Sequence, residues 1–238
     1  MSCASVHFLR TVQVTSAILA GGRSSRLRRN KLFRRVAGKP LIEWVIGRVR
    51  PMSRQLVVVV SDPQTTPGVE ESVHRLAQGG EIVPACDVRV VQDLVSGCGP
   101  LGGIYTALSV SSAPRCIVVG CDMPFLRQEL LEYLVLALQG YDAVVPRVGH
   151  FIEPLCAVYH WRCLPHFAEA LGQGEFQIRQ ALEGVRTRFV EESEIEMLDP
   201  HRYSFFNVNT RAELEAARRL AAGDQLLPAL SGEGRKKW

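Results

Sequence analysis

The sequence lacks any hydrophobic run long enough to cross a membrane. Of its 238 residues, 47% are apolar, but the longest uninterrupted aliphatic runs lie at residues 56–60 and 134–138. These runs are far shorter than the roughly 20 apolar residues that a bilayer span needs. The N-terminal region also lacks the apolar core of a signal peptide. We therefore expect a cytoplasmic protein with no membrane partner.

Cysteine and histidine form no disulfide or metal-binding pattern. The seven cysteines are odd in number, scattered and without a Cys-x-x-Cys pair, and the six histidines include no His-Glu-x-x-His motif. The sequence therefore predicts neither a disulfide framework nor a zinc site. A chain of this length buries a sizeable apolar core without such supports. These features are typical of a globular protein in a reducing compartment.

Positive charge is concentrated in one segment. The formal net charge of the chain is +4, but residues 23–50 hold ten Arg or Lys residues against one acid, Glu43, which gives +9 locally and −5 elsewhere. A basic segment of this density favours a phosphorylated partner. That partner is a nucleic acid, a membrane surface or a phosphate-rich small molecule, and composition does not choose among them.

Short apolar runs alternate with segments of helical period along the chain. The strand candidates are residues 14–19, 56–60, 88–91, 116–119, 143–145, 152–159 and 205–208. The helix candidates are residues 40–49, 102–110, 128–138, 161–171, 176–183 and a last one that follows the capping-box pattern of Thr210 and Glu213 and ends near Ala222. This alternation predicts an α/β fold with a mostly parallel central sheet covered by helices on both faces. We expect one three-layer α/β/α domain over residues 14–222, between an N-terminal extension (1–13) and a C-terminal tail (223–238).

A glycine loop follows the first strand candidate directly, in the run Leu19-Ala20-Gly21-Gly22-Arg23-Ser24-Ser25-Arg26. Paired glycines let a phosphate approach backbone N–H groups, and Ser24, Arg26 and Lys31 add donors and positive charge. The run has neither the Walker spacing nor the Rossmann glycine spacing. A simple glycine turn with solvated arginines is the alternative interpretation.

Two aspartates follow other strand candidates. Asp93 precedes the glycine-rich run Gly99-Pro100-Leu101-Gly102-Gly103, which opens a helix, and Asp122 follows the apolar run 116–119. Ligands of open α/β sheets bind at the carboxyl ends of the strands, where a carboxylate can hold Mg²⁺ with its bound phosphate. Taken singly, Asp93 is equally well explained as a turn or cap residue. For Asp122, an Asp-x-Pro turn is the less favoured alternative.

The order of motifs resembles that of a known family. The glycine loop, Lys31 and the run Ala37-Gly38-Lys39-Pro40-Leu41-Ile42 resemble the signature of nucleotidyltransferases with a Rossmann-like fold of the nucleotide-diphospho-sugar transferase type. Four further runs resemble the molybdenum cofactor guanylyltransferase family, and the resemblance covers about residues 14–222. They are residues 99–103, Cys121-Asp122-Met123-Pro124-Phe125-Leu126, Glu153-Pro154-Leu155-Cys156-Ala157-Val158-Tyr159 and Phe206-Asn207-Val208-Asn209-Thr210.

This resemblance implies an Mg²⁺-dependent reaction in which the phosphate of molybdopterin attacks the α-phosphorus of GTP and releases pyrophosphate. The product is a guanine dinucleotide cofactor, which acceptor molybdoenzymes would receive. Arg26, Lys31 and Asp122 would act in catalysis, with Asp122 as the metal ligand. The residues implied to bind nucleotide are Leu19, Ala20, Gly21, Gly22, Ser24, Lys31, Ser61, Asp93, Gly99 and Asp122. Asn207 and Asn209 match paired asparagines on the pterin-facing side.

Three alternatives stay open at this point. A cytidylyltransferase or another related nucleotidyltransferase would use the same loop, although the Leu-Ala-Gly-Gly form favours the GTP branch. A nucleotide-binding protein without turnover is suggested by Arg28, where the family has glycine, and by Ser61, where it commonly has asparagine. Nucleic-acid binding through the basic segment is weaker, because the charges flank a glycine loop without a recognition helix. We expect no nucleic-acid partner.

Overall fold

The computed structural model of the chain describes residues 13–21, 29–79 and 86–223. Its strands are β1 (Val14–Ala20), β2 (Arg35–Val36), β3 (Lys39–Pro40), β4 (Gln55–Val60), β5 (Asp87–Gln92), β6 (Arg115–Gly120), β7 (Ala143–Val148), β8 (Phe151–Ile152), β9 (Cys156–His160) and β10 (Thr187–Val190). Its α-helices are α2 (Arg29–Leu32), α3 (Leu41–Val49), α4 (Thr66–Gln78), α5 (Gly99–Val110), α6 (Gln128–Ala137), α7 (Leu164–Gly172), α8 (Ile178–Ala181), α9 (Glu192–Leu198) and α10 (Arg211–Ala221). Short 3-10 helices lie at Arg50–Met52, Pro63–Thr65, Trp161–Cys163 and Tyr203–Phe205.

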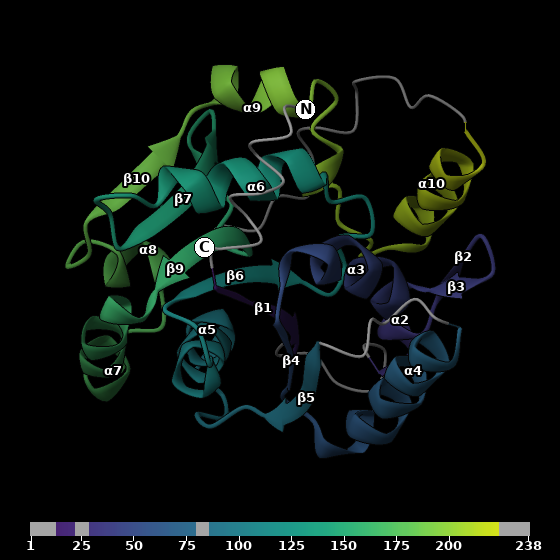
Figure 1. The fold of residues 1–238 in the computed structure, drawn as a ribbon, viewed down its shortest axis with the longest axis horizontal. Coiled ribbons are helices and arrows are strands. Elements are labelled where there is room, and N and C mark those ends of the chain that lie inside the picture. The colour runs from purple at the N-terminus through teal and green to yellow at the C-terminus, as the bar shows by residue number, and fades with distance from the viewer. Residues whose placement is uncertain (1–12, 22–28, 80–85, 224–238) are drawn as a thin grey trace.

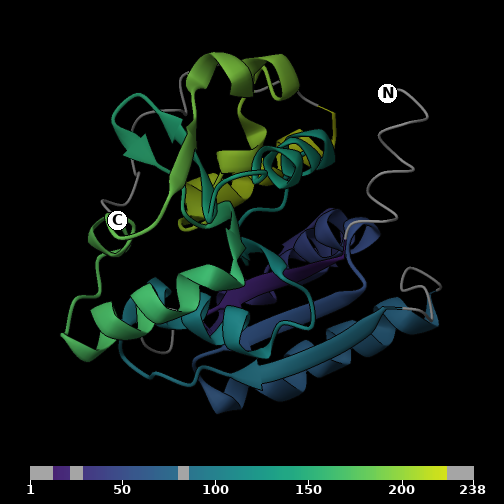
Figure 2. The same cartoon turned by 60° about the vertical axis from the view of Figure 1, so that its left-hand side comes forward.

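One mixed sheet forms the centre of the molecule (Figure 1). Its strand order is β10-β7-β9-β6-β1-β4-β5, and β8 pairs with β7. Strand β1 is parallel to both β4 and β6, and β4 is parallel to β5, whereas β9 runs antiparallel to β6 and β7. Figure 2 shows β1, β4 and β5 running side by side. The expected mostly parallel sheet is therefore confirmed.

Helices cover both faces of this sheet. Successive side chains of a strand point to opposite faces, and Ala17 and Ile18 of β1 accordingly lie in two different apolar clusters. The cluster around Ile18 includes residues from α3, α4, α6 and α9, and the cluster around Ala17 includes residues from α5, α7 and α8. The predicted three-layer α/β/α arrangement is confirmed. The described residues contain no helix that is both long and apolar enough to span a bilayer.

Most predicted elements are present with bounds shifted by a few residues. The strand expected at 152–159 is wrong as a single element, because residues 153–155 form a turn between β8 and β9. The N–H of Glu153 donates to the carbonyl of Pro146 (2.9 Å), and the N–H of Cys156 donates to the carbonyl of Glu153 (3.0 Å). Pro154 within this turn has no N–H for a strand ladder.

The last expected strand, at residues 205–208, is also wrong. The buried carboxylate of Asp199 accepts hydrogen bonds from the N–H groups of Tyr203 (3.0 Å) and Ser204 (2.7 Å), which turns the chain into a 3-10 helix. From there the chain runs without regular structure to α10, whose capping box at Thr210 and Glu213 is present as predicted. The expected N-terminal extension and C-terminal tail lie almost wholly outside the described residues.

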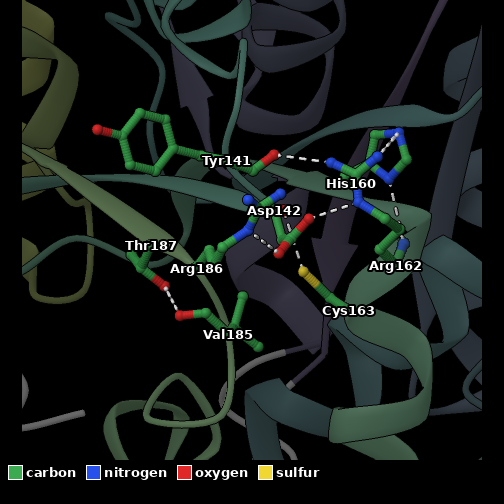
Figure 3. Close-up of polar contacts among 8 residues, drawn as sticks. All are labelled: Tyr141, Asp142, His160, Arg162, Cys163, Val185, Arg186 and Thr187. Carbon is green, nitrogen blue, oxygen red and sulfur yellow. Dashed lines mark hydrogen bonds and ion pairs between the residues drawn. The ribbon is translucent and has the colours of Figure 1, made fainter.

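The edge of the sheet at the amino ends of β6 and β7 is held by a polar cluster around Asp142 (Figure 3). The carboxylate of Asp142 pairs with the guanidinium groups of Arg162 and, at 3.3 Å, Arg186. Burial acts to raise the pKa of Asp142, but the two arginines outweigh it and hold that pKa below its usual range. The Cys163 thiol donates to the Asp142 carbonyl (3.1 Å), and burial raises its pKa to about 12. This cluster joins β7, β9 and β10.

Candidate active site at the carboxyl ends of the strands

Four parallel strands end at one edge of the sheet. In the register, Ala20 of β1 lies beside Val60 of β4, Val60 lies beside Gln92 of β5, and Leu19 lies beside Gly120 of β6. The residues that follow these strands therefore line one edge in the spatial order β6, β1, β4, β5, which Figure 1 lets the reader follow. They include the predicted site residues Gly21, Ser61, Asp93 and Asp122. This edge is where ligands bind in open α/β sheets.

At this edge, the ammonium group of Lys31 contacts two residues that are far from it in the sequence. Its Nζ lies 2.7 Å from Oδ2 of Asp122 and 2.7 Å from Oδ1 of Asn209. The side chains of Lys31 and Asp122 are only 11% and 13% exposed, so water screens their ion pair little. The structure thus brings together three of the predicted residues, which lie on α2, after β6 and before α10.

The strand end and a chain crossing hold Asp122 in place. The N–H of Cys121 donates to the carbonyl of Leu19 (3.2 Å), and the carbonyl of Asp122 accepts from the N–H of Val208 (2.9 Å). Gly120 makes room for the carboxylate, because a Cβ at this position would lie 2.7 Å from Oδ1 of Asp122. The backbone of Asp122 is therefore held at the end of β6 and beside the segment that carries Asn209.

The start of α10 holds Asn209. One carboxylate oxygen of Glu213 accepts from the backbone N–H groups of both Asn209 and Thr210, each at 2.6 Å. The Thr210 hydroxyl in turn accepts from the N–H of Glu213 (3.1 Å). This reciprocal capping satisfies free N–H groups at the helix start and orients the residue immediately before it. The amide oxygen of Asn209 is thereby presented to Lys31.

The two asparagines of the predicted pterin-facing pair differ in their contacts. Asn209 contacts Lys31, whereas the Nδ2 of Asn207 donates to the carbonyl of Phe205 (3.0 Å) within its own loop. Beside them, the ring of Phe125 packs between those of Trp44 and Phe206, with centroids 5.9 Å apart in each pair. The geometry places Asn209 with the lysine and the carboxylate, and a contact of either asparagine with a pterin stays a prediction.

Asp93 lies at the far end of the same edge. Two strands, β1 and β4, separate it from Asp122, a span of about 14 Å at the usual strand spacing. Its Oδ1 accepts from the Thr106 hydroxyl (2.8 Å) and from the N–H of Val95 (3.2 Å), and its own N–H donates to Val60 (2.8 Å). Asp93 and Asp122 are therefore too far apart to contact one small ligand together.

Thr106 was not anticipated as a site residue. It is fully buried in the apolar helix α5, where its hydroxyl donates to Asp93 and accepts from the N–H of Leu94 (3.0 Å). It therefore fixes both the carboxylate and the loop that leads into α5. The only signal in the sequence is a polar side chain within the otherwise apolar run Gly103-Ile104-Tyr105-Thr106-Ala107-Leu108.

Close packing surrounds the described part of the predicted glycine loop. A Cβ on Gly21 would lie 2.8 Å from Oγ of Ser61, and a Cβ on Gly103 would lie 3.0 Å from a methyl of Leu19. Gly99, at the start of α5, has φ +63°, a conformation that glycine adopts without strain. The predicted residues Gly22, Ser24 and Arg26, together with Arg28, lie outside the described residues.

Comparisons with known proteins show the family to which the chain belongs. A family model described as the MobA-like NTP transferase domain matches residues 16–188. The "probable molybdenum cofactor guanylyltransferase" of Pelotomaculum thermopropionicum is 36% identical over 210 residues, which are 88% of this chain and 94% of that protein. The molybdenum cofactor guanylyltransferase of Desulfosudis oleivorans is 32% identical over 86% of this chain and 94% of its own length. The chain belongs to the MobA-like NTP transferase family.

Solved structures of other proteins share the fold of this chain. The molybdopterin-guanine dinucleotide biosynthesis protein A of Archaeoglobus fulgidus matches with a TM-score of 0.68 and 29% identity, over 88% of this chain and all of that chain. The 4-diphosphocytidyl-2C-methyl-D-erythritol synthase of Anaerococcus prevotii matches with a TM-score of 0.66 at 12% identity, over 89% of this chain and 99% of that chain, a likeness of fold alone. This member of the MobA-like family is thus a nucleotidyltransferase with the predicted fold.

Proposed function

We propose that the protein transfers GMP from GTP to the phosphate of molybdopterin, with release of pyrophosphate. Membership in the MobA-like family and the names of its relatives support this activity. The observation that carries it is the contact of Lys31 with both Asp122 and Asn209 at the carboxyl edge of the sheet. That edge presents a lysine for phosphate and oxygen ligands for a divalent cation in one place.

The donor set at this edge fits Mg²⁺. Asp122 and Asn209 each direct an oxygen at the same positive charge, and oxygen is the ligand atom that Mg²⁺ prefers. The described residues contain no group of three or more His, Cys, Asp or Glu side chains placed to hold a metal. Mg²⁺ needs none, because it is usually held by one or two carboxylates together with waters and substrate phosphates. When bound, it would neutralise charge that develops on the departing pyrophosphate.

The chain's own groups position the reactants. In the proposed reaction an oxygen of the molybdopterin phosphate forms a bond to the α-phosphorus of GTP, and the bond to the bridging oxygen of the pyrophosphate breaks. Lys31 holds phosphate oxygens, and Arg26 is proposed to assist it. No covalent intermediate with a side chain is needed, so positioning and fixed charge supply the catalysis.

The far end of the edge suits the nucleoside. Asp93 lies about three strand spacings from Asp122. One carboxylate oxygen of Asp93 accepts a hydrogen bond from the Thr106 hydroxyl. The other carboxylate oxygen is proposed to accept from the N–H groups of guanine. A cytosine base, which presents a different donor pattern, is the alternative ligand of a cytidylyltransferase. We place the reaction in the cytoplasm and propose acceptor molybdoenzymes as recipients of the product.

Two other functions receive less support. A nucleotide-binding protein without turnover has no need for a carboxylate at the phosphate end, yet Asp122 is present and fixed by backbone contacts. The basic segment suggests nucleic-acid binding as another function. Lys31 of this segment points inward to Asp122, so its charge is not presented on an open surface.

Thermal unfolding with nucleotides tests the proposal. A ligand that binds only the folded state raises its stability, by about 2.7 kcal/mol at a concentration of 100 Kd. We expect GTP to raise the Tm more than CTP or ATP, with a further rise on adding Mg²⁺. Asp122→Asn should lose the Mg²⁺ increment, whereas Asp87→Asn, at the opposite end of β5, should keep it. A larger shift with CTP than with GTP would refute the guanylyl assignment.

A further inference from the structure

The ammonium of Lys31 stands where a cation is expected. Its Nζ lies 2.7 Å from one oxygen of Asp122 and 2.7 Å from one oxygen of Asn209. These are the two oxygens assigned to Mg²⁺ in the proposed function. The ion pair is nearly enclosed, with Lys31 11% and Asp122 13% exposed.

A divalent cation and this ammonium exclude each other. Mg²⁺ binds its oxygen ligands at 2.0–2.1 Å, so a cation held by both of these oxygens would occupy the space between them that Nζ now takes. Both cations use the same oxygen lone pairs, and their like charges repel strongly in a site with little water. Binding of the metal therefore requires the Lys31 side chain to leave Asp122 and Asn209.

A lysine has the means to make such a move. Its ammonium is a point charge on a flexible four-carbon stem, and the triphosphate of a nucleotide offers it new anionic partners. Asp122 has a much shorter side chain, and backbone hydrogen bonds of Cys121 and Val208 hold the main chain that carries it. Asn209 is similarly held by Glu213. The two oxygens therefore stand on short side chains of a held backbone, whereas the ammonium stands on a long, flexible one.

We infer that Lys31 and a divalent cation are alternative occupants of the oxygen pair formed by Asp122 and Asn209, and that nucleotide binding makes the exchange. Without nucleotide, Lys31 fills the position and lowers the affinity for the metal. When nucleotide is bound, its phosphates form the ion pair with the Lys31 ammonium and supply the remaining metal ligands. Nucleotide and metal then bind with positive coupling, and each raises the affinity for the other equally. This inference rests on the proposed function.

The test measures Mn²⁺ binding to the full chain without nucleotide, by the EPR signal of free Mn²⁺. We expect Lys31→Met to bind Mn²⁺ about tenfold or more tightly than the unaltered protein, a change within the usual range of coupling between sites. Lys31→Gln, which keeps a polar side chain, should show the same gain. Arg115→Met is the matched control, since it removes one positive charge at the opposite end of β6. Its Mn²⁺ affinity should stay unchanged.

Two results would overturn the inference. One is unchanged or weaker Mn²⁺ binding in both Lys31 variants. The other is a gain that persists in Lys31→Met with Asp122→Asn, because the extra metal would then bind elsewhere. If GTP with Mg²⁺ still stabilises the unaltered protein in either case, the proposed function stands and only the exchange is wrong. If GTP gives no stabilisation, the proposed function itself fails.

Discussion

Lys31 and Asp122 lie 91 positions apart in the sequence and form an ion pair of 2.7 Å at the carboxyl edge of the sheet. The pair connects the short helix α2 to the end of β6, and Asn209 adds the segment before α10. Three parts of the chain therefore depend on one another for the shape of the phosphate end. Substitutions that loosen any of them should affect turnover more than they affect overall stability.

Removal of the cap at α10 should lower turnover through Asn209. Glu213→Ala deletes the acceptor of two backbone N–H groups and should cost about 1 kcal/mol of unfolding free energy, as lost caps typically do. Because Asn209 then loses its orientation, kcat should also fall. Urea unfolding and steady-state kinetics measure the two effects.

Glu215→Ala is the control for this change. Glu215 lies on the same helix and pairs only with Arg218 among the described contacts, with half of its side chain exposed. Exposed pairs of this kind contribute little, so neither stability nor kcat should change appreciably. Equal loss of kcat in both variants would show that the capping box does not position Asn209.

Thr106→Val should weaken nucleotide binding while the shape of the core is kept. The substitution removes the hydroxyl that holds Asp93 and accepts from Leu94, and it leaves the N–H of Leu94 without that partner, at a cost of about 1–3 kcal/mol. We expect a higher KM for GTP with a smaller change in kcat, because Asp93 lies far from the phosphate end. Ser109→Ala, on an exposed part of the same helix, should leave KM unchanged. A change confined to kcat would contradict the assignment of Asp93 to the nucleoside.

Asp142 should make the protein sensitive to acid. Two arginines hold its pKa below the usual range despite the opposing effect of burial. Because its pKa is lower in the folded than in the unfolded chain, Asp142 stabilises fully above its unfolded value of about 3.9 and loses this contribution as the pH falls through its folded pKa. Asp142→Asn should therefore lower unfolding free energy by about 1–2 kcal/mol at pH 7, with a smaller loss in acid.

Urea unfolding at pH 7 and pH 3 checks this expectation. The matched control is Asp87→Asn, since Asp87 pairs with Arg89 at an exposed position and should contribute little at either pH. If the loss in Asp142→Asn were the same at both pH values, the ionised form of Asp142 would not be the source of the stabilisation.

The sequence predicted the parts of the fold that depend on local pattern. The buried strand around Val58 is an almost continuous apolar run, the strand around Ile18 is mostly apolar, and the capping box at Thr210 identifies the start of α10. Strand β10 (Thr187–Val190) was not predicted, because its first three residues are only partly buried and two of them, Thr187 and Arg188, are polar. Helix α4 (Thr66–Gln78) was not predicted either, as its buried residues are few among polar ones.

The site was predictable only in part. Strand ends indicated Asp93 and Asp122, the basic glycine loop indicated Lys31, and family resemblance supplied Asn209. No local pattern relates residues that are 91 and 178 positions apart, so their meeting required the three-dimensional structure. The separation of Asp93 from Asp122 follows from strand order, which places β1 and β4 between them.

The formation of product from competing nucleotides tests the central claim most directly. The purified protein is incubated with molybdopterin, Mg²⁺ and equal amounts of GTP and CTP, and the product is identified by mass spectrometry while pyrophosphate is measured. We predict a guanine dinucleotide with one pyrophosphate per product, formed at least about 100-fold more slowly by folded Asp122→Asn, a loss typical of removing transition-state charge stabilisation. A cytosine dinucleotide as the main product, or an unchanged rate in Asp122→Asn, would contradict the claim.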